Sequence, residues 1–413
     1  MNVLFLHQNF PGQFKHLAPA LVQQGHQVVA MIMQKNAPPQ WQGVKLINYF
    51  PNRGSTPNIH PWLVDFETKT IRAESVFHQA YQLREQGFNP DVVIANPGWG
   101  ESLLIKDVWT ETKLGIYCEF FYHASGYDTT FDPEFASMDE TEVCRIRWKN
   151  LNHYLHFDIA DGGLAPTRWQ ADSFPEPFRS KLTVIHDGID TNLLRPNANA
   201  SLTFNSQINL NRNDEIITFV NRNLEPYRGY HSFMRSLPEI LTNRPNAKVL
   251  IVGGNGVSYG AKPPGDRPWR DIFLEEVKGK LTPQQLNRLY FLGTIPYNYF
   301  INLLQISTVH IYLSYPFVLS WSLLESMACG CAIVASNTAP VREVITDGET
   351  GRLVDFFDYS AIATTICQLL EDKEERQRLG TNARRLVQAK YDLQTICLPQ
   401  QLQWLGELVS PQH

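Results

Sequence analysis

One segment, residues 309–353, constrains the fold more than any other part of the chain. A β-branched run at 309–313 is followed by a short loop, and a helix-like run then begins at Ser320 and ends at Gly330. A second apolar, strand-like run occupies 332–335. This order of strand, loop, helix and strand is typical of a parallel α/β sheet, where ligands bind beyond the carboxyl ends of the strands. We therefore expect a ligand site at the loop that leads into Ser320.

The chemistry of this loop and helix favours a nucleotide. The first turn of a helix presents unpaired N–H groups, which suit an anion such as phosphate. Glu325 follows about one turn later, where a carboxylate suits hydroxyl groups such as those of a ribose. The alternative is that Glu325 only complements the helix dipole, a gain of about 0.3–1 kcal/mol. Because Leu323, Leu324 and Met327 predict a buried helix, a glutamate there needs a hydrogen-bonding partner.

The segment resembles the donor-site signature of family 4 glycosyltransferases, which have the GT-B fold. That family typically shows two glutamates eight positions apart, around a helix entry rich in Gly and Leu. Glu325 stands at the second glutamate, whereas Phe317 stands at the first and Ser320 at the usual helix-entry glycine. In the family the first carboxylate binds the transferred sugar. With Phe317 there, either sugar recognition has moved elsewhere or catalysis has been lost.

The resemblance also suggests how the helix entry would hold the donor. The backbone N–H groups of Leu319, Ser320 and Trp321 are expected to bind sugar hydroxyls and phosphate. The Ser320 hydroxyl is expected to cap the helix.

Size and composition are those of a globular protein with two domains. The chain has 413 residues, of which 43% are apolar and 19% charged. The net charge of −5 does not suggest a broad nucleic-acid surface.

No run approaches the roughly 20 apolar residues of a membrane span. The N-terminus lacks a basic region and predicts a first strand rather than a signal peptide. Six cysteines without a CxxC pair suggest free thiols in the cytoplasm and no metal.

Alternating strand-like and helix-like runs predict an open α/β sheet in each half of the chain. In the first half we expect strands at 3–6, 28–33, 91–95 and 115–120, a helix at 13–24, and irregular loop through most of 38–68. In the second half we expect strands at 216–221, 248–252 and 288–292, a helix at 230–242, and helices from 360 onward.

The polar tract at 197–214 is expected to lack regular structure and to hold the domain boundary. We therefore expect an acceptor-side Rossmann-like domain at 1–196 and a nucleotide-sugar-binding Rossmann-like domain at 197–395. A terminal helix within 396–413 is expected to pack back on the first domain. The resemblance implies the GT-B arrangement, with two parallel sheets facing an interdomain cleft.

Two arginines predict a diphosphate clamp. Arg222 follows a strand end, and Arg228 precedes a glycine at a helix entry. Guanidinium groups beside a helix N-terminus suit a diphosphate through charge and bidentate hydrogen bonds. The family has Arg and Lys at these positions. The alternative is that both are solvated loop residues. No Asp, Glu or His cluster stands near them in the sequence, so we expect a metal-independent site, as in the family.

Two glycine-containing turns complete the predicted donor site. Gly253 and Gly254 follow a strand, but their spacing is not GxGxxG, so a nicotinamide cofactor is not favoured. The turn resembles the family's glycine loop near the donor. Gly293 and Thr294 follow another strand, where the family holds the base with backbone groups. Backbone groups of this kind are compatible with uracil, but the sequence does not select the base.

The resemblance places further candidates in the first half. Gly12 lies in the loop after the first strand, where the family's glycine loop faces donor phosphate and acceptor. His123 lies just past a strand, where the family commonly has a histidine near the donor sugar, although such a histidine is more often structural. Glu119, Tyr122 and Asp128 are expected on the acceptor side, and the loop 122–135 is expected to form an acceptor wall.

The expected function is that of a retaining glycosyltransferase that moves a hexose from a nucleoside-diphosphate sugar, with UDP as the expected nucleotide, to an acceptor hydroxyl. Retention is implied by the resemblance. The nucleotide sugar is a co-substrate, and no cofactor is expected. The acceptor could be a glycan, a lipid, a protein or a small metabolite, with peripheral membrane contact left open. Two alternatives are an inert sugar-nucleotide-binding protein and a sugar-nucleotide epimerase of the same fold.

Overall fold

The computed structural model describes residues 1–136, 139–204 and 208–410. The chain forms two compact units. The first unit comprises Met1–Thr129, Ser137–Asp187 and Gln394–His413. The second comprises Thr130–Ala136 and Gly188–Leu393.

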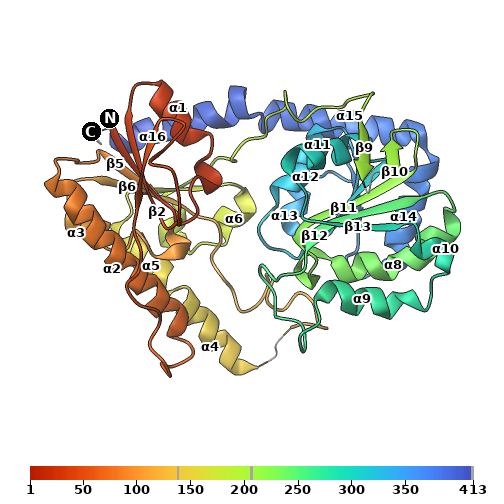
Figure 1. The fold of residues 1–413 in the computed structure, drawn as a ribbon, viewed down its shortest axis with the longest axis horizontal. Helices are drawn as coiled ribbons and strands as arrows, with labels where there is room; N and C mark the ends of the chain where they lie inside the picture. The colour runs from red at the N-terminus through yellow and green to blue at the C-terminus, as the bar shows by residue number, and fades with distance from the viewer. Residues whose placement is uncertain (137–138, 205–207, 411–413) are drawn as a thin grey trace. The chain divides into compact units, whose positions relative to one another are not determined.

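The first unit is built on an eight-stranded sheet with the order β3-β4-β2-β1-β5-β6-β7-β8 (Figure 1). The strands are β1 (Asn2–Leu6), β2 (Gln27–Ile32), β3 (Gln40–Trp41), β4 (Val44–Asn48), β5 (Val92–Ala95), β6 (Lys113–Tyr117), β7 (Gly162–Ala165) and β8 (Leu182–Val184). Neighbouring strands are parallel except in the β3–β4 pair. The strand order reverses between β1 and β5, which makes their carboxyl ends a favoured place for a ligand.

Helices cover both faces of this sheet. They are α1 (Leu17–Gln23), α2 (Val64–Glu85), α3 (Ile105–Val108), α4 (Glu140–Lys149), α5 (Leu151–Ile159), α6 (Arg168–Asp172), α7 (Glu176–Arg179) and α16 (Leu398–Val409), with short 3₁₀ turns η1 (Gly12–Phe14) and η2 (Pro97–Trp99). Side chains of β1 alternate between the faces, because successive residues of a strand point to opposite sides. Val3 and Phe5 pack with Trp404 of α16, whereas Leu4 and Leu6 pack on the α2 face.

The second unit is built on a six-stranded parallel sheet with the order β13-β12-β11-β14-β15-β16. The strands are β11 (Ile216–Asn223), β12 (Lys248–Gly254), β13 (Leu289–Gly293), β14 (Val309–Tyr312), β15 (Ala332–Ser336) and β16 (Arg352–Val354). An antiparallel pair, β9 (Ser201–Phe204) and β10 (Ile208–Asn211), lies beside it in sequence. The strand order of the large sheet reverses between β11 and β14.

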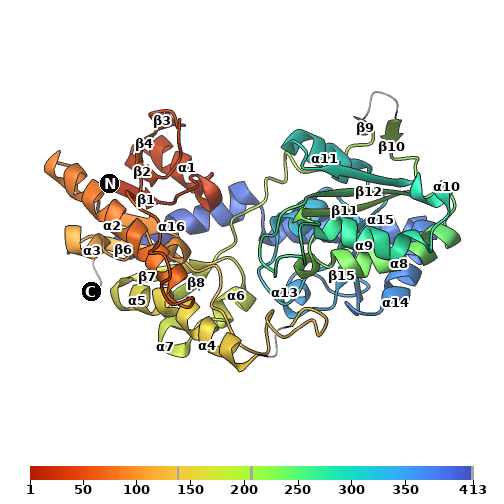
Figure 2. The same cartoon turned by 60° about the horizontal axis from the view of Figure 1, so that its bottom comes forward.

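The helices of the second unit are α8 (Tyr230–Asn243), α9 (Trp269–Lys278), α10 (Pro283–Leu286), α11 (Tyr297–Ile306), α12 (Trp321–Ala328), α13 (Ala339–Arg342), α14 (Tyr359–Glu371) and α15 (Lys373–Lys390). The turn η3 (Pro226–Arg228) precedes α8, and a π-helical turn η4 (Leu393–Cys397) follows α15. One core joins the sheet to α8, α9 and α14, and a second core joins it to α11, α12 and α15. Figure 2 shows α8, α9 and α14 on one side of the strands and α11 on the other.

The structure corrects two of the loop predictions. Residues 38–68 contain β3, β4 and the start of α2, and β4 pairs in parallel with β2. The tract 197–214 contains β9 and β10, and the side chains of Leu202 and Leu210 are buried beneath them. Both segments are rich in polar residues, and sheet pairing supplies the backbone partners that the local sequence does not suggest.

The segment Thr130–Ala136 packs with the second unit, although the sequence analysis placed it in an acceptor wall of the first domain. Phe131 and Phe135 explain this difference, because both rings pack against the aromatic core of the second unit. At the other end of the chain, Trp404 and Leu405 of α16 are buried in the first unit.

Within the described residues, no helix has both the length and the apolar character needed to cross a membrane.

Candidate functional site

The candidate site lies at the carboxyl edge of the sheet in the second unit, around the reversal between β11 and β14. The predicted donor residues stand at or beyond the carboxyl ends of four neighbouring strands: Gly293 and Thr294 at β13, Gly253 and Gly254 at β12, Arg222 and Arg228 at β11, and Leu319, Ser320, Trp321 and Glu325 beyond β14. An open α/β sheet binds ligands at such a reversal because the loops diverge there and leave a crevice.

Arg228 is buried, and its guanidinium is held in place by neighbours. Its Nη1 donates to Ser314 Oγ (2.9 Å) and to the Val318 carbonyl (3.0 Å). The guanidinium carbon lies 5.2 Å from the ring centroid of Tyr259, at cation–π distance. A cation that is oriented before a ligand arrives needs little reorganisation to stabilise negative charge.

Gly229 allows η3 and α8 to approach β14 closely. Its φ of +69° is a left-handed conformation that favours glycine. A Cβ at this position would lie 2.2 Å from Leu313 Cβ. The glycine that the sequence analysis noted after Arg228 is therefore required by backbone conformation and by packing.

Arg222 differs from Arg228 because it is exposed. In the described part of the chain, no hydrogen bond or ion pair to its side chain is found. Its carbonyl lies 3.4 Å from the position that a Cβ on Gly254 would occupy, so β11 and β12 end close together. The same hypothetical Cβ lies 3.6 Å from Thr294 Oγ1, which brings the end of β13 to this point as well.

Glu225 organises the loop after β12, and sequence reasoning missed it. Its carboxylate is buried and accepts backbone N–H groups from Ser258 (3.0 Å), Tyr259 (3.3 Å) and Gly260 (3.4 Å). These bonds explain how a carboxylate can be buried here, and they fix the ring of Tyr259 near Arg228. The only signal in the sequence was the position of Glu225 between two candidate arginines.

Glu325 has the partner that its buried helix requires. It is the fifth residue of α12 and is mostly buried, and Tyr297 Oη donates to its Oε1 at 2.6 Å. Tyr297 opens α11, shortly after Gly293 and Thr294. Burial and the negative charge of Glu325 raise the pKa of the Tyr297 hydroxyl. The carboxylate is thereby oriented, and it stands beyond the end of β14, as the ribose hypothesis requires.

Two N–H groups at the entry of α12 are already hydrogen-bonded within the protein. Ser320 is the N-cap of α12, and its hydroxyl accepts the Ser322 N–H at 3.4 Å. Its own N–H donates to Tyr312 Oη at 2.9 Å. That N–H is therefore already used within the protein, whereas the sequence analysis assigned it to the donor.

Phe317 takes part in an aromatic wall. Its buried ring lies 5.0 Å from Tyr259 and 5.4 Å from Tyr227, both in edge-on contacts. The position at which the family has a carboxylate is therefore apolar and packed, next to the ring that faces Arg228.

In the first unit, Gly12 and His123 lie beyond the carboxyl ends of β1 and β6. Gly12 has φ +50°, and a Cβ there would lie 2.8 Å from the His7 ring. His123 Nε2 lies 2.7 Å from the Ser173 carbonyl, to which it donates. The imidazole also stacks on Tyr127, with ring centroids 4.1 Å apart. One nitrogen of His123 thus has a structural partner, which leaves Nδ1 as the atom for any acid–base role.

The other acceptor-side candidates are held by the surrounding helices. The Glu119 carbonyl accepts from Gln170 Nε2 at 2.7 Å, and Asp128 is buried. Lys149 Nζ lies 3.4 Å from the ring centroid of Tyr122. Burial lowers the pKa of Lys149 to about 8. Sequence reasoning missed this lysine, which lies outside the candidate loop.

A buried carboxyl near the reversal between β1 and β5 was also missed. Glu101 is 1% exposed, and the Tyr49 hydroxyl donates to it. Burial raises the pKa of Glu101 to about 7, although the hydrogen bond from Tyr49 acts in the opposite direction. A carboxyl that changes protonation near neutrality is a notable group at this edge of a sheet.

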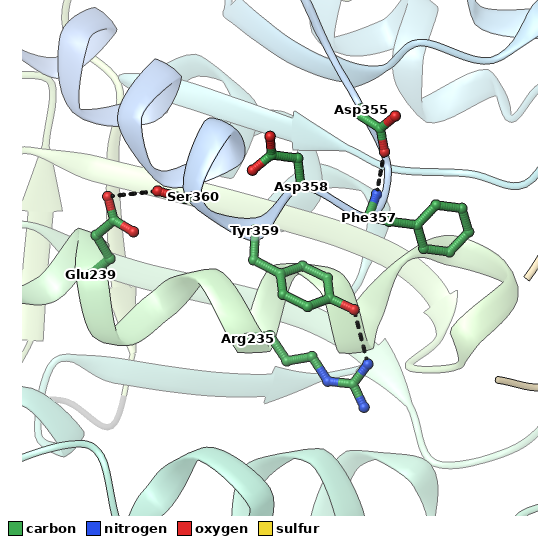
Figure 3. Close-up of a pocket in the computed structure, with 7 residues that line it drawn as sticks. All are labelled: Arg235, Glu239, Asp355, Phe357, Asp358, Tyr359 and Ser360. Atoms are coloured by element: carbon green, nitrogen blue, oxygen red, sulfur yellow. Dashed lines mark hydrogen bonds between the residues drawn. The ribbon is translucent and has the colours of Figure 1, made fainter. Parts of the chain in front are cut away.

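Two further features of the second unit involve residues that were not among the predicted donor residues. A cavity of about 660 Å³ lies between α8 and the start of α14. The side chains that line it, shown in Figure 3, are Arg235, Glu239, Asp355, Phe357, Asp358, Tyr359 and Ser360. Asp132, Glu134 and His231 each place a potential metal ligand within 4.8 Å of the others. However, Arg235 pairs with both oxygens of Glu134, and Tyr315 donates to Asp132.

Comparisons with known proteins agree with the resemblance. Residues 24–194 match the family model described as "Glycosyl transferase family 4 group", and residues 202–386 match "Glycosyl transferases group 1". The D-inositol 3-phosphate glycosyltransferase of Corynebacterium efficiens is 28% identical over 207 residues, covering 49% of this chain and 46% of the relative. Spore coat protein SA of Bacillus subtilis is 26% identical over 237 residues, covering 53% and 57%. The chain thus matches about half the length of these relatives.

Solved structures match nearly the whole chain. The sucrose-phosphate synthase from Thermosynechococcus elongatus has a TM-score of 0.73 at 19% identity, with 99% of each chain covered. Anabaena HepE, solved in complex with UDP-glucose, has a TM-score of 0.64 at 16% identity, with 98% of this chain and 99% of that chain covered. At these identities the likeness establishes the fold alone.

Proposed function

Because the chain belongs to the group 1 glycosyltransferases of family 4 and has their GT-B fold, we propose that it transfers a hexose from a nucleoside-diphosphate sugar to an acceptor hydroxyl. The second unit binds the donor in this proposal, and the first unit supplies the acceptor side.

The preorganised guanidinium of Arg228 carries the proposal. It is buried, oriented by Ser314 and Val318, and placed at the same sheet edge as Arg222 and Glu325. A buried cation is costly unless negative charge or hydrogen bonds compensate for it. A diphosphate would supply that charge at the carboxyl ends of β11 and β14.

The three groups have separate roles in this mechanism. When the bond between sugar and phosphate breaks, negative charge develops on the diphosphate, and Arg222 and Arg228 stabilise it. Glu325, oriented by Tyr297, accepts hydrogen bonds from the ribose hydroxyls. The site therefore contributes alignment and charge stabilisation, and the two arginines do this without a metal ion.

UDP is the donor nucleotide that we propose, and this choice is supported by Anabaena HepE, which was solved with UDP-glucose. Gly293 and Thr294 would hold the base, and the backbone near Gly253 and Gly254 would face the donor. Retention of the anomeric configuration is proposed from family membership. Glu119, Tyr122, His123 and Asp128 are the acceptor-side residues of the proposal, with Gly12 in the loop facing the donor phosphate.

The decisive measurement is UDP binding by calorimetry, together with turnover of a panel of radiolabelled nucleotide sugars. Arg222→Ala should weaken UDP binding and lower turnover, whereas Arg212→Ala is the matched control. Arg212 is also exposed but precedes the amino end of β11. Full activity of Arg222→Ala would refute the clamp. Loss of activity in EDTA that Mg²⁺ restores would refute metal independence.

Phe317 favours a second candidate, a sugar-nucleotide-binding protein without turnover. The packed aromatic ring leaves no carboxylate at this position for the transferred sugar. Tight UDP binding with no turnover of any donor in the panel would support this candidate over the transferase. Restoring turnover with Phe317→Glu would assign the loss to this side chain.

A further inference from the structure

A short segment joins the second unit from within the sequence of the first. The chain passes from the first unit to the second after Thr129 and returns at Ser137, so that Thr130–Ala136 belongs to the second unit. We call this segment the strap. The sequence predicted most of this segment to lie in an acceptor wall, and the proposed donor residues assign it no role.

The strap is anchored by aromatic and charged contacts. The Phe131 ring lies 5.2 Å from each of the rings of Tyr315, Phe356 and Phe357. The Phe135 ring lies 5.2 Å from His231 and 5.4 Å from Trp269. Between them, Glu134 pairs with Arg235, whose Nη1 and Nη2 donate to it at 2.6 and 2.8 Å. Such contacts make the strap part of the core that joins the sheet of the second unit to α8, α9 and α14, rather than a surface loop.

Asp132 is the buried polar centre of the strap. It is 2% exposed, the Tyr315 hydroxyl donates to its Oδ2 at 2.6 Å, and His231 Nε2 lies 3.0 Å from the same oxygen. Burial alone would raise the pKa of Asp132, but the interactions with His231 and Tyr315 outweigh burial and hold that pKa below its usual value. Asp132 is therefore a charged acceptor that orients Tyr315.

Tyr315 connects the two loops on either side of the reversal between β11 and β14. Its N–H donates to the Tyr227 carbonyl at 3.0 Å, which joins the loop after β14 to η3. Its carbonyl accepts the Phe317 N–H at 2.8 Å and the Ser314 hydroxyl at 3.1 Å. Ser314 Oγ is in turn the acceptor for Arg228 Nη1. A continuous series of hydrogen bonds thus leads from Asp132 to the Arg228 guanidinium.

We propose that the strap positions the nucleotide site: Asp132 fixes Tyr315, and Tyr315 fixes the loop that orients Arg228 and Phe317. Asp132 is a positioning residue, because it acts through Tyr315. The statement about the nucleotide rests on the proposed function, whereas the statement about the loop does not.

The first test measures hydrogen exchange of the loop amides in the absence of any ligand. In full-length Asp132→Ala, hydrogen exchange at the amides of Tyr315 and Phe317 should be faster than in the wild type, because the backbone bonds of this loop lose their anchor. Asp132→Asn should show a smaller change, since the amide oxygen can still accept from Tyr315. Glu134→Gln is the comparison variant on the same strap and should change these two amides less than Asp132→Ala does, because Glu134 contacts Arg235 and not Tyr315.

The second test measures UDP affinity by calorimetry in Asp132→Ala, in Tyr315→Phe and in the variant that combines both changes. A hydrogen bond to a charged group corresponds to about a tenfold change in an equilibrium constant, so Asp132→Ala and Tyr315→Phe should each weaken UDP binding by about tenfold. The double variant Asp132→Ala/Tyr315→Phe should bind no more weakly than the weaker of these two single variants, because both changes remove the same Asp132–Tyr315 hydrogen bond. Glu134→Gln should weaken UDP binding less than Asp132→Ala does.

The outcomes separate the two proposals. Unchanged exchange at Tyr315 and Phe317 in folded Asp132→Ala and Asp132→Asn overturns the strap, whatever nucleotide is bound. Wild-type UDP affinity in Asp132→Ala and in Tyr315→Phe, or effects of these two changes that add in their double variant, also overturns it. If the wild-type protein binds no nucleoside diphosphate, the proposed function fails, and with it the role of the strap in nucleotide binding.

Discussion

At the scale of residues, most ionisable groups of the candidate site are held by named partners. Ser314 and Val318 hold Arg228, Tyr297 holds Glu325, and backbone N–H groups hold Glu225. Sequence patterns could identify Arg228 and Glu325, because each stands at a helix entry or in its first turns. The patterns could not identify Tyr297 as the partner of Glu325, because the two residues lie on different helices.

Glu325 provides a residue-scale prediction about the ribose. If its carboxylate binds the ribose hydroxyls, wild-type protein should bind UDP more tightly than 2′-deoxy-UDP. Glu325→Gln should reduce this preference, because a neutral amide accepts hydrogen bonds more weakly than a carboxylate. We expect the loss to be about tenfold in UDP affinity and smaller for the deoxynucleotide. Calorimetry with both nucleotides measures it, and an undiminished ribose preference in the variant would contradict the role of Glu325.

Glu101 provides a residue-scale prediction about pH. Its pKa is raised from 4.5 to about 7 by burial, so between these values the folded state keeps a proton that the unfolded state has lost. The stability that Glu101 contributes is therefore complete below pH 4.5 and is lost as the pH rises through 7. A shift of this size corresponds to about 3 kcal/mol.

The comparison with Glu101→Gln isolates this effect, because the buried histidines titrate alike in both proteins. From pH 5 to pH 8, the free energy of unfolding of the wild type should fall relative to that of the variant by about 2–3 kcal/mol. Amide exchange in the strands of the first unit measures this difference in the free energy of unfolding. Parallel pH profiles for the two proteins would show that Glu101 does not titrate in this range.

At the scale of elements, the strands and helices that carry the donor residues follow from local patterns. The expected strand at 216–221 is β11, and the expected helix at 230–242 is α8, with small differences in their ends. The strand β4 was missed because only its pairing with β2 and β3 reveals it. Local composition predicts turns well, but it cannot show that a polar segment completes its hydrogen bonds in a sheet.

The junction of η3 and α8 provides the element-scale prediction. Gly229→Ala should destabilise the second unit by about 2–4 kcal/mol, because alanine disfavours positive φ and its Cβ would meet Leu313. The control is Gly279→Ala at the end of α9, where φ is −67° and an added Cβ meets no atom within 4 Å. Denaturant unfolding measures the free energy of unfolding of both variants. Equal stability of the two would contradict the close packing inferred at Gly229.

At the scale of the whole molecule, the chain contains two units, each with its own mostly or fully parallel sheet and its own cores. Separate cores predict that a ligand bound to one unit stabilises mainly that unit. At a UDP concentration of about 100 times Kd, the amides of β11 and β12 should gain up to about 2.7 kcal/mol of protection. The amides of β1 and β5 serve as the internal control and should gain much less. Exchange measured by mass spectrometry tests this, and equal protection in both units would place the nucleotide elsewhere.

The sequence alone was sufficient for the family, the GT-B fold and the location of the donor candidates at strand ends. The family and the GT-B fold followed from the resemblance of the segment around Glu325, whereas the two parallel α/β halves and their strand ends followed from local signals, namely apolar periodicity, a helix cap and glycines at turns. The tertiary structure alone decided that Asp132 meets Tyr315, a residue 183 positions away, that Glu225 binds the loop after β12, and that Tyr49 meets Glu101. Periodicity determines which face of an element is buried, but packing between distant segments determines which partner that face meets.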